Sequence, residues 1–314
     1  ASEALRARCM TATDADVRAI LAKGRADSLE DFAVLASPAA TRHLEALAAL
    51  SQRLTQSHFG KVIRLFAPLY LSNECVNICK YCGFSRNNPI PRITIPVSQV
   101  VEETRKLARQ GIRNLLLVAG EHPKFVSNGY VKECVERCLP IMPGISLELG
   151  PLERAPYVPL VDAGCEGLVV YQETYHRETY KQLHVAGPKK RFDWRMDTPE
   201  RAYGAGFRKL GIGALFGLAD WRFEALALAS HARYLTRRCW KASLSLSFPR
   251  MRPAAGGFQV DPANQLPDRE FVQLIAAMRM LLPHSTFVLS TRESPQFRDG
   301  VMTLGITQMS ARAS

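Results

Sequence analysis

The stretch that decides the fold is LFAPLYLSNECVNICKYCGFS, residues 65–85. It starts as an apolar run typical of a buried strand and continues directly into three cysteines, Cys75, Cys79 and Cys82. Seven more apolar runs with strand-like composition follow it. With the first run at 62–72, they occupy 114–121, 145–152, 166–174, 209–218, 243–253, 286–293 and 306–310.

Amphipathic stretches separate these runs and predict helices. The clearest ones cover residues 98–110, 130–139, 222–238 and 269–282. Alternation of strands and helices along one chain predicts a parallel sheet covered by helices. Eight strands favour a closed, TIM-like (β/α)₈ barrel over an open doubly wound sheet. We therefore expect an α/β barrel over residues 61–314.

Residues 1–60 are expected to form an N-terminal helical extension. Leu44, Leu47, Leu50 and Leu54 recur there at helical spacing. Compared with the family that the motifs described below resemble, the chain is expected to lack a closing helix and tail after the eighth strand, since the sequence stops at residue 314.

Composition excludes several classes of protein. The chain has 314 residues, is 47% hydrophobic, and carries 41 Lys+Arg against 29 Asp+Glu, a formal charge of 41 − 29 = +12. A chain of this length buries a core without disulfides. No run reaches the roughly 18 apolar residues that a membrane span needs, and the first residues have no apolar leader core. We expect a cytoplasmic protein without a membrane partner.

The positive charge by itself would allow nucleic-acid binding. The basic residues are spread along the chain, however, and no nucleic-acid-binding module is recognisable. We therefore expect no nucleic-acid partner, and keep a basic nucleic-acid-binding iron–sulfur protein as the alternative from a different class.

The cysteines divide into one cluster and five scattered residues. Cys75, Cys79 and Cys82 have the spacing CxxxCxxC. Structural zinc takes four ligands, usually in paired CxxC units, and no second pair exists here. Three thiolates suit three irons of a four-iron, four-sulfur (4Fe-4S) cluster and leave one iron open for chemistry. The alternative is three buried structural thiols.

Polar side chains fall where the predicted strands end. They are Glu121, Glu148, Gln172 with Glu173, Arg250 with Arg252, and Arg292 with Glu293. The carboxyl ends of barrel strands meet at one face, where barrel enzymes carry their active sites. We expect the cysteines and these side chains to share that face.

With Tyr81 before its last cysteine, the motif CxxxCxΦC resembles the radical S-adenosylmethionine (SAM) superfamily. Further stretches extend the resemblance, over residues 60 to 310, to its aromatic amino acid lyases, and FDWRMDTPERAYGAG (192–206) is most like the tyrosine-cleaving branch. These further stretches are LLLVAGEHP (115–123), VVYQETYHRETY (169–180), LGIGALFGL (210–218), SFPRMRPAAGG (247–257) and STRESPQFRDGV (290–301).

The resemblance implies a reaction and two cofactors. Cys75, Cys79 and Cys82 would hold the 4Fe-4S cluster, whose open iron binds the amino and carboxylate groups of SAM. A 5′-deoxyadenosyl radical would then take a hydrogen atom from the amino group of L-tyrosine. Cleavage of the Cα–Cβ bond would yield 2-iminoacetate and p-cresol, the former for the thiazole of thiamine.

The resemblance also assigns roles to single residues. Residues expected to contact SAM are Tyr81, Glu121, Gln172, Glu173, Gly211 and Gly213. Arg252, with Arg250, is the candidate for the substrate carboxylate, and Ser290 and Arg292 would line the same chamber. Plainer interpretations exist for each: solvated or turn-capping polar groups, packing glycines, and arginines paired only with barrel acids.

The resemblance implies L-tyrosine as substrate, and a thiazole synthase and a flavodoxin- or ferredoxin-type electron donor as protein partners. Two related activities compete with this interpretation. One is a tryptophan lyase. The other is the tyrosine lyase of iron-hydrogenase maturation, which needs a C-terminal cysteine motif, whereas no cysteine follows Cys239 here.

Overall fold

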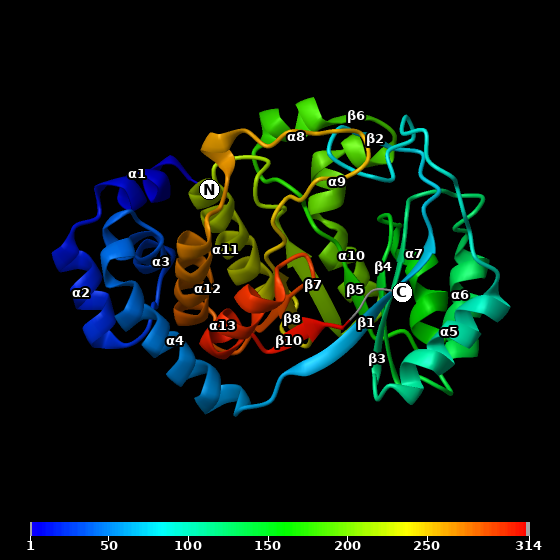
Figure 1. Cartoon of the computed structure of the whole chain (residues 1–314), viewed down its shortest axis with the longest axis horizontal. Helices are drawn as coiled ribbons and strands as arrows, with labels where there is room; N and C mark the ends of the chain where they lie inside the picture. The colour runs from blue at the N-terminus through cyan, green and yellow to red at the C-terminus, as the bar shows by residue number, and fades with distance from the viewer. Residues whose placement is uncertain (1, 312–314) are drawn as a thin grey trace.

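The computed structural model describes residues 2–311, and its centre is a closed barrel of eight parallel strands (Figure 1). The strands follow one another around the barrel in the order β1-β10-β9-β8-β7-β5-β4-β3. They are β1 (Arg64–Ser72), β3 (Asn114–Ala119), β4 (Gly144–Glu148), β5 (Gly167–Val169), β7 (Lys209–Gly213), β8 (Ser243–Ser247), β9 (Thr286–Leu289) and β10 (Gln308–Ser310). All eight predicted strands and the predicted barrel are confirmed.

Helices cover the outside of the barrel. The four predicted from amphipathic spacing are α5 (Val97–Arg109), α6 (Asn128–Cys138), α11 (Trp221–Arg238) and α12 (Asp268–Leu281). Five more were not singled out in the sequence: α7 (Arg154–Asp162), α8 (Arg177–Leu183), α9 (Phe192–Met196), α10 (Thr198–Ala205) and α13 (Pro295–Gly305). Most of these are short or contain proline, which weakens a helical pattern. No helix among residues 2–311 is long and apolar enough to cross a membrane.

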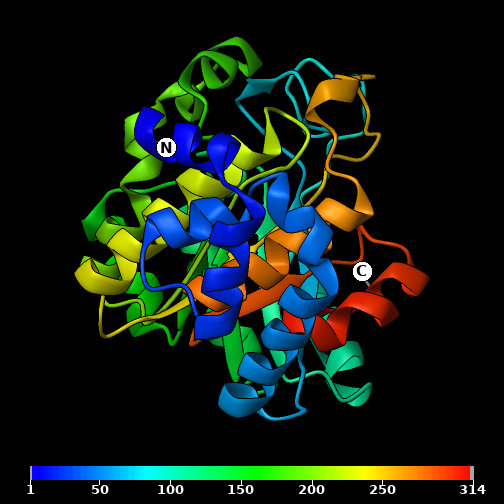
Figure 2. The ribbon, with the colours of Figure 1, turned by 90° about the vertical axis from the view of Figure 1, so that its left-hand side faces the viewer.

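Four further α-helices precede the barrel: α1 (Glu3–Thr11), α2 (Asp14–Lys23), α3 (Leu29–Leu35) and α4 (Leu44–Phe59). Thr13 and Asp16 form a reciprocal capping box that starts α2. The helices lie beside α11, α12 and α13 on one side of the barrel (Figures 1 and 2). Their buried residues are continuous with the barrel core. The predicted boundary at residue 60 falls between α4 and β1.

Strand register decides which side chains face the barrel interior. Tyr70 pairs with Val118, and Val118 pairs with Glu148, so these residues lie at one level on β1, β3 and β4. Residues in register on parallel strands point to the same side of the sheet. Closer to the start of the strands, Phe66 and Leu116 form a small apolar cluster with Val118. A small apolar cluster thus lies below the polar groups at the carboxyl ends of the strands, while Ser146, Ser245 and Thr286 line a second pocket nearer the starts of the strands.

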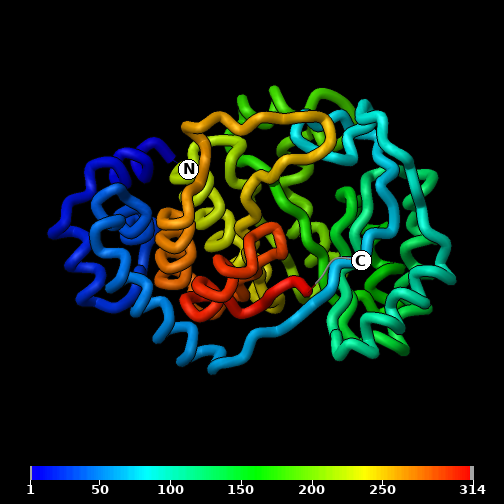
Figure 3. Tube along the Cα trace, viewed as in Figure 1, coloured from blue at the N-terminus to red at the C-terminus, as the bar shows by residue number. Residues whose placement is uncertain are grey.

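A two-stranded antiparallel sheet, β2 (Ile78–Cys79) with β6 (His184–Ala186), lies beyond the carboxyl ends of the barrel strands. Beside it, the segment after β8 approaches the cysteine loop (Figure 3). The Asn88 side-chain amide donates to the carbonyls of Cys82, Gly83 and Ala255, which joins the two loops. The cysteine loop is therefore fixed from two sides by segments distant in sequence.

Candidate active site

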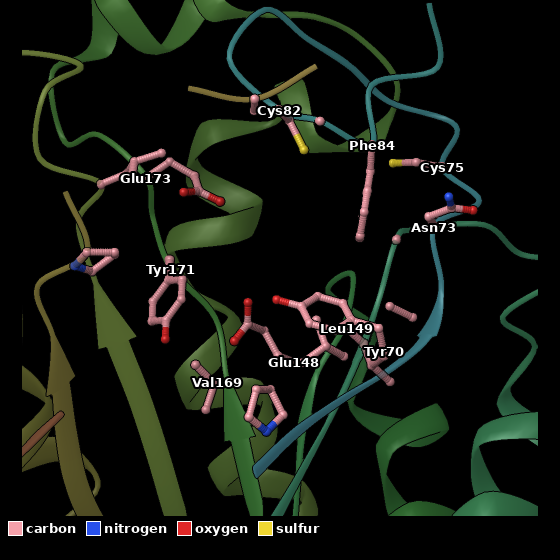
Figure 4. A pocket seen from close by; sticks show the side chains of 18 of the residues that line it. Tyr70, Asn73, Cys75, Cys82, Phe84, Glu148, Leu149, Val169, Tyr171 and Glu173 are labelled. Carbon is pink, nitrogen blue, oxygen red and sulfur yellow. The ribbon is translucent and has the colours of Figure 1, made fainter. Parts of the chain in front are cut away.

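A cavity of about 800 Å³ occupies the end of the barrel at the carboxyl ends of the strands. Cys75, Cys79 and Cys82 line it together with residues of β1, β3, β4, β5, β8, β9 and β10. Figure 4 shows the sulfurs of Cys75 and Cys82 at one end of this space, and Glu148 and Tyr171 further inside. The cavity thus lies at the face of the barrel that the sequence predicted, and the three cysteines line it.

The three cysteines are free thiols and differ in exposure. Cys79 is buried and belongs to β2, where it pairs with His184 of β6, while Cys75 and Cys82 are half-buried. Burial raises the pKa of Cys79 to about 12, against the opposing effect of Lys189, and burial also raises the pKa of Cys82. Thiolates at these positions need a positive partner, and bound iron is such a partner.

Residues 2–311 contain no group of three His, Cys, Asp or Glu side chains that could hold a single metal ion. A four-iron cluster does not require such convergence, because each iron takes its own thiolate. Three thiols that come from one loop and line one cavity therefore fit a cluster better than a zinc ion.

Asn77 connects the cysteine loop to the strand that carries Glu121. Its amide nitrogen donates to Glu121 Oε2 at 2.7 Å and lies 3.6 Å from Cys75 Sγ. Its Oδ1 accepts from the backbone N–H of Lys189 at 2.9 Å. Glu121 also lies across Gly150, where an added Cβ would come within 2.4 Å of its Cγ. Glu121 is thereby held at the cavity wall beside the cysteines.

Glu173 lies at the centre of a buried charged group. Its carboxylate accepts from Lys189 Nζ at 2.6 Å and lies 3.7 Å from Arg195 Nη2. All three side chains line the cavity. Burial would raise the pKa of Glu173, but Lys189 and Arg195 outweigh it and lower that pKa. The backbone of Glu173 has φ = +70°, a left-handed conformation that costs free energy for a residue other than glycine.

We expect Glu173→Gln to lower the free energy of unfolding by about 3 kcal/mol, because two buried cations lose their counter-charge. Urea denaturation of the cluster-free protein measures this change. The double variant E173Q/K189M should lose less than the sum of its single variants, since it removes one unpaired cation. Strictly additive losses would show that the pair contributes nothing.

Tyr81 is buried next to the cysteines, as expected of a residue at the SAM site. Its hydroxyl lies 2.8 Å from His184 Nε2, and its ring meets Phe258 edge to face. Lys189 Nζ lies 5.7 Å from its ring centroid. The aromatic ring therefore forms part of the cavity wall rather than of the molecular surface.

Three residues expected to contact SAM do not line this cavity. Gln172 points away, and its amide donates to the carbonyl of Phe192 at 3.3 Å. Gly211 and Gly213 face the barrel interior, where neighbouring side chains use the space that they leave. An added Cβ would meet Val169 at 2.8 Å and Tyr171 at 2.9 Å, respectively. Their interpretation as packing glycines explains these contacts.

The two arginines after β8 have different surroundings. Arg250 is held by Glu293, by Asp268 at 2.6 Å and by the Leu266 carbonyl, and its side chain does not line the cavity. It connects the end of β8 to α12, so the structure does not support the expected contact with a substrate carboxylate. Arg252 does line the cavity, and its Nη2 contacts Glu293 at 2.8 Å.

Ser290 and Arg292, at the carboxyl end of β9, line the cavity as expected. Arg292 is exposed to it and has no carboxylate partner among residues 2–311, whereas Glu293 is shared by Arg250 and Arg252. An unpaired guanidinium in a cavity is suited to bind a ligand carboxylate with two hydrogen bonds. Arg292 therefore fits this role better than either arginine after β8.

Several residues of the site were not singled out in the sequence: Tyr70, Asn77, Tyr171, Lys189 and Arg195. They follow no motif, and their positions depend on pairing between segments far apart in the chain, as in the ion pair of Glu173 with Lys189. The period of two along β1 and after β5 was the one available signal, because it places Tyr70 and Tyr171 on the inner face.

Comparisons with known proteins agree with this geometry. The radical SAM superfamily model matches residues 69–229, and the model of the biotin and thiamin synthesis associated domain matches residues 247–314. The 2-iminoacetate synthases of Escherichia coli (strain K12) and Salmonella typhimurium are each 41% identical over 308 residues, 98% of this chain and 81% of theirs. The crystal structure of HydG, a maturase of the FeFe-hydrogenase, superposes with a TM-score of 0.93 at 31% identity, over 99% of this chain and 71% of that one.

A closed parallel barrel with three cysteines at its open end, matched by this superfamily model, defines a radical SAM enzyme. The cofactors of that superfamily are the 4Fe-4S cluster and SAM expected from the sequence. Within the superfamily, the chain belongs to the 2-iminoacetate synthase family, as the identity over nearly its whole length shows.

Proposed function

We propose that this chain cleaves the Cα–Cβ bond of L-tyrosine and forms 2-iminoacetate and p-cresol, the former for the thiazole of thiamine. The observation that carries the proposal is the 41% identity to 2-iminoacetate synthases over 98% of the chain. The cavity supports it, because three thiols lie at one end and an unpaired guanidinium lies among the residues of its wall.

The residues present fit both cofactors. Cys75, Cys79 and Cys82 would hold the cluster, and Glu121 with Tyr81 would contact SAM, because they line the cavity beside the cysteines. When bound, the cofactors supply a 5′-deoxyadenosyl radical that abstracts hydrogen. Glu173, with Lys189 and Arg195, would add a polar wall of one carboxylate and two cations at the same end.

The substrate groups are placed by the opposite wall. Arg292 would bind the carboxylate of tyrosine, with Arg252 and Ser290 beside it. After one hydrogen atom leaves the amino group, the Cα–Cβ bond breaks into 2-iminoacetate and a hydroxybenzyl fragment. That fragment takes up one electron and one proton to become p-cresol. The apolar layer around Phe66 and Leu116 keeps the aromatic ring away from water.

A substrate panel tests the proposal. Cluster-reconstituted protein, incubated without oxygen with SAM, dithionite and L-tyrosine, should release 5′-deoxyadenosine together with p-cresol. The same cleavage of tryptophan would release 3-methylindole instead. Formation of 5′-deoxyadenosine and 3-methylindole, without p-cresol from tyrosine, would establish the tryptophan lyase alternative.

Partners and location belong to the same proposal. Exposed Lys80, Arg86, Lys181 and Lys190 lie on the cysteine loop and around the β2–β6 sheet, next to the buried Cys79. A positive surface this close to the cysteines suits an acidic electron donor of the flavodoxin or ferredoxin type. We also propose a thiazole synthase as the protein that takes up 2-iminoacetate. The free thiols of all eight cysteines are in keeping with a reducing, cytoplasmic location.

A further inference from the structure

Glu148 is a carboxyl group inside the barrel without a protein partner. It is the last residue of β4 and lines the cavity. Among residues 2–311, no side chain forms a hydrogen bond or ion pair with its carboxylate. Figure 4 shows that carboxylate directed into the open space, with Tyr70 on one side and Tyr171 on the other. A half-buried carboxylate that faces a cavity takes its hydrogen bond from whatever occupies that cavity, water or a ligand.

The position of Glu148 in the barrel selects the part of a ligand that it can reach. It lies at the level of Tyr70 and Val118, directly above the apolar layer that contains Phe66 and Leu116. The cysteines lie at the other end of the cavity (Figure 4). The amino group of tyrosine must face the cysteine end, because hydrogen is taken from it there. The ring therefore points away from the cysteines, and its hydroxyl, the far end of the substrate, is the group that reaches the level of Glu148.

The surrounding groups leave Glu148 available as an acceptor. Tyr171 is occupied, since its hydroxyl donates to Ser247 Oγ at 3.2 Å. The Tyr70 hydroxyl has no hydrogen-bond partner within residues 2–311. Charged groups acting on Glu148 are Glu173, Arg292, Lys189 and Arg195. Burial, followed by Glu173, raises the pKa of Glu148 to about 7, so the carboxylate form that accepts a hydrogen bond predominates above neutral pH.

We propose that Glu148 is the residue that selects tyrosine: its carboxylate accepts the hydrogen bond of the phenolic hydroxyl and so disfavours phenylalanine and tryptophan. The inference rests on the proposed tyrosine cleavage and names the specificity-determining residue of that site. A buried site built around a substrate hydroxyl rejects the analogue without it by a large factor, because its own polar group is then left unpaired.

Binding of two amino acids to two variants tests the proposal. Dissociation constants of L-tyrosine and L-phenylalanine are measured by calorimetry on the cluster-loaded enzyme with SAM, without oxygen and without reductant. We expect the wild-type protein to prefer tyrosine by at least about a hundredfold. Glu148→Leu should weaken tyrosine binding by about a hundredfold and strengthen phenylalanine binding, because the unpaired carboxylate is gone. Poor folding would weaken the binding of both amino acids, so it cannot shift their dissociation constants in opposite directions.

The matched control is Glu166→Gln, at the opposite end of the barrel, where Glu166 pairs with Lys209. It should leave the ratio of the two dissociation constants unchanged. If E148L fails to load a cluster, E148Q replaces it, and the tyrosine preference should then fall about tenfold. An equal change for both amino acids would overturn the proposal, since Glu148 would then bind a group that they share.

Failure of the proposed function would look different. If the wild-type enzyme forms no p-cresol from tyrosine, the lyase activity itself is wrong, whatever the variants bind. If the wild-type enzyme forms p-cresol but E148L keeps the ratio of the wild-type dissociation constants, only the role of Glu148 is wrong.

Discussion

Replacing Cys79 by alanine should abolish both cluster binding and SAM cleavage. Cys79 is the buried member of the three thiols and is fixed within β2 by the pairing of this strand with β6. Iron–sulfur clusters are held by cysteine thiolates, and loss of one ligand removes the open-iron arrangement. Iron content and visible absorption after anaerobic reconstitution measure the cluster. Release of 5′-deoxyadenosine should fall to the background of cluster-free protein.

Cys239→Ala is the matched control for this prediction. Cys239 is equally buried but caps the carboxyl end of α11, outside the cavity. We expect its substitution to cost about 1 kcal/mol of stability and to leave the iron content unchanged. Full iron content in the Cys79→Ala protein would show that these cysteines do not hold the cluster.

Arg292→Ala should lower kcat/KM for tyrosine by roughly a hundredfold or more, because the substrate carboxylate loses its charged partner. Its melting temperature should stay close to that of the wild-type protein, since Arg292 has no ion pair within residues 2–311. Arg292→Lys keeps the charge but not the two parallel hydrogen bonds, so its kcat/KM should lie between those of the wild-type and Arg292→Ala proteins. Rates of p-cresol formation at varied tyrosine concentration provide the measurement.

Arg250→Ala makes the contrasting comparison. It leaves Glu293 and Asp268 without their shared cation, and it removes packing against Phe271 and Phe297. We expect a lower melting temperature, with the affinity of the remaining folded enzyme for tyrosine little changed. If Arg250→Ala reduced tyrosine affinity more than Arg292→Ala at equal stability, the assignment of the carboxylate to Arg292 would be wrong.

The strands of the barrel could be predicted because their apolar runs are continuous, and the loop with Cys75, Cys79 and Cys82 because its spacing is compact. Which side chains face the barrel interior follows the period of two along a strand. Tyr171 and Glu173 face inward, and Gln172 between them points away. Adjacent residues of an extended segment point to opposite sides. The prediction that both Gln172 and Glu173 contact SAM therefore conflicted with the period of two.

The arginines show where sequence rules stop. Arg250 and Arg252 are two residues apart and were expected to share a face, but β8 ends at Ser247. Beyond that point only an isolated bridge of Arg250 with Phe216 continues the ladder, and both arginines contact Glu293. Lys189 and Arg195 could not be predicted for the same reason, because their place in the site depends on ion pairs with Glu173.

Isotope labelling of the substrate shows which bond breaks and so tests the proposed reaction most directly. L-tyrosine labelled with ¹³C at Cα is incubated with the cluster-loaded enzyme, SAM and dithionite, and the products are analysed by mass spectrometry. We expect unlabelled p-cresol and a labelled two-carbon product, recovered as glyoxylate after hydrolysis of 2-iminoacetate. Label in the aromatic product, or 5′-deoxyadenosine without either fragment, would contradict it.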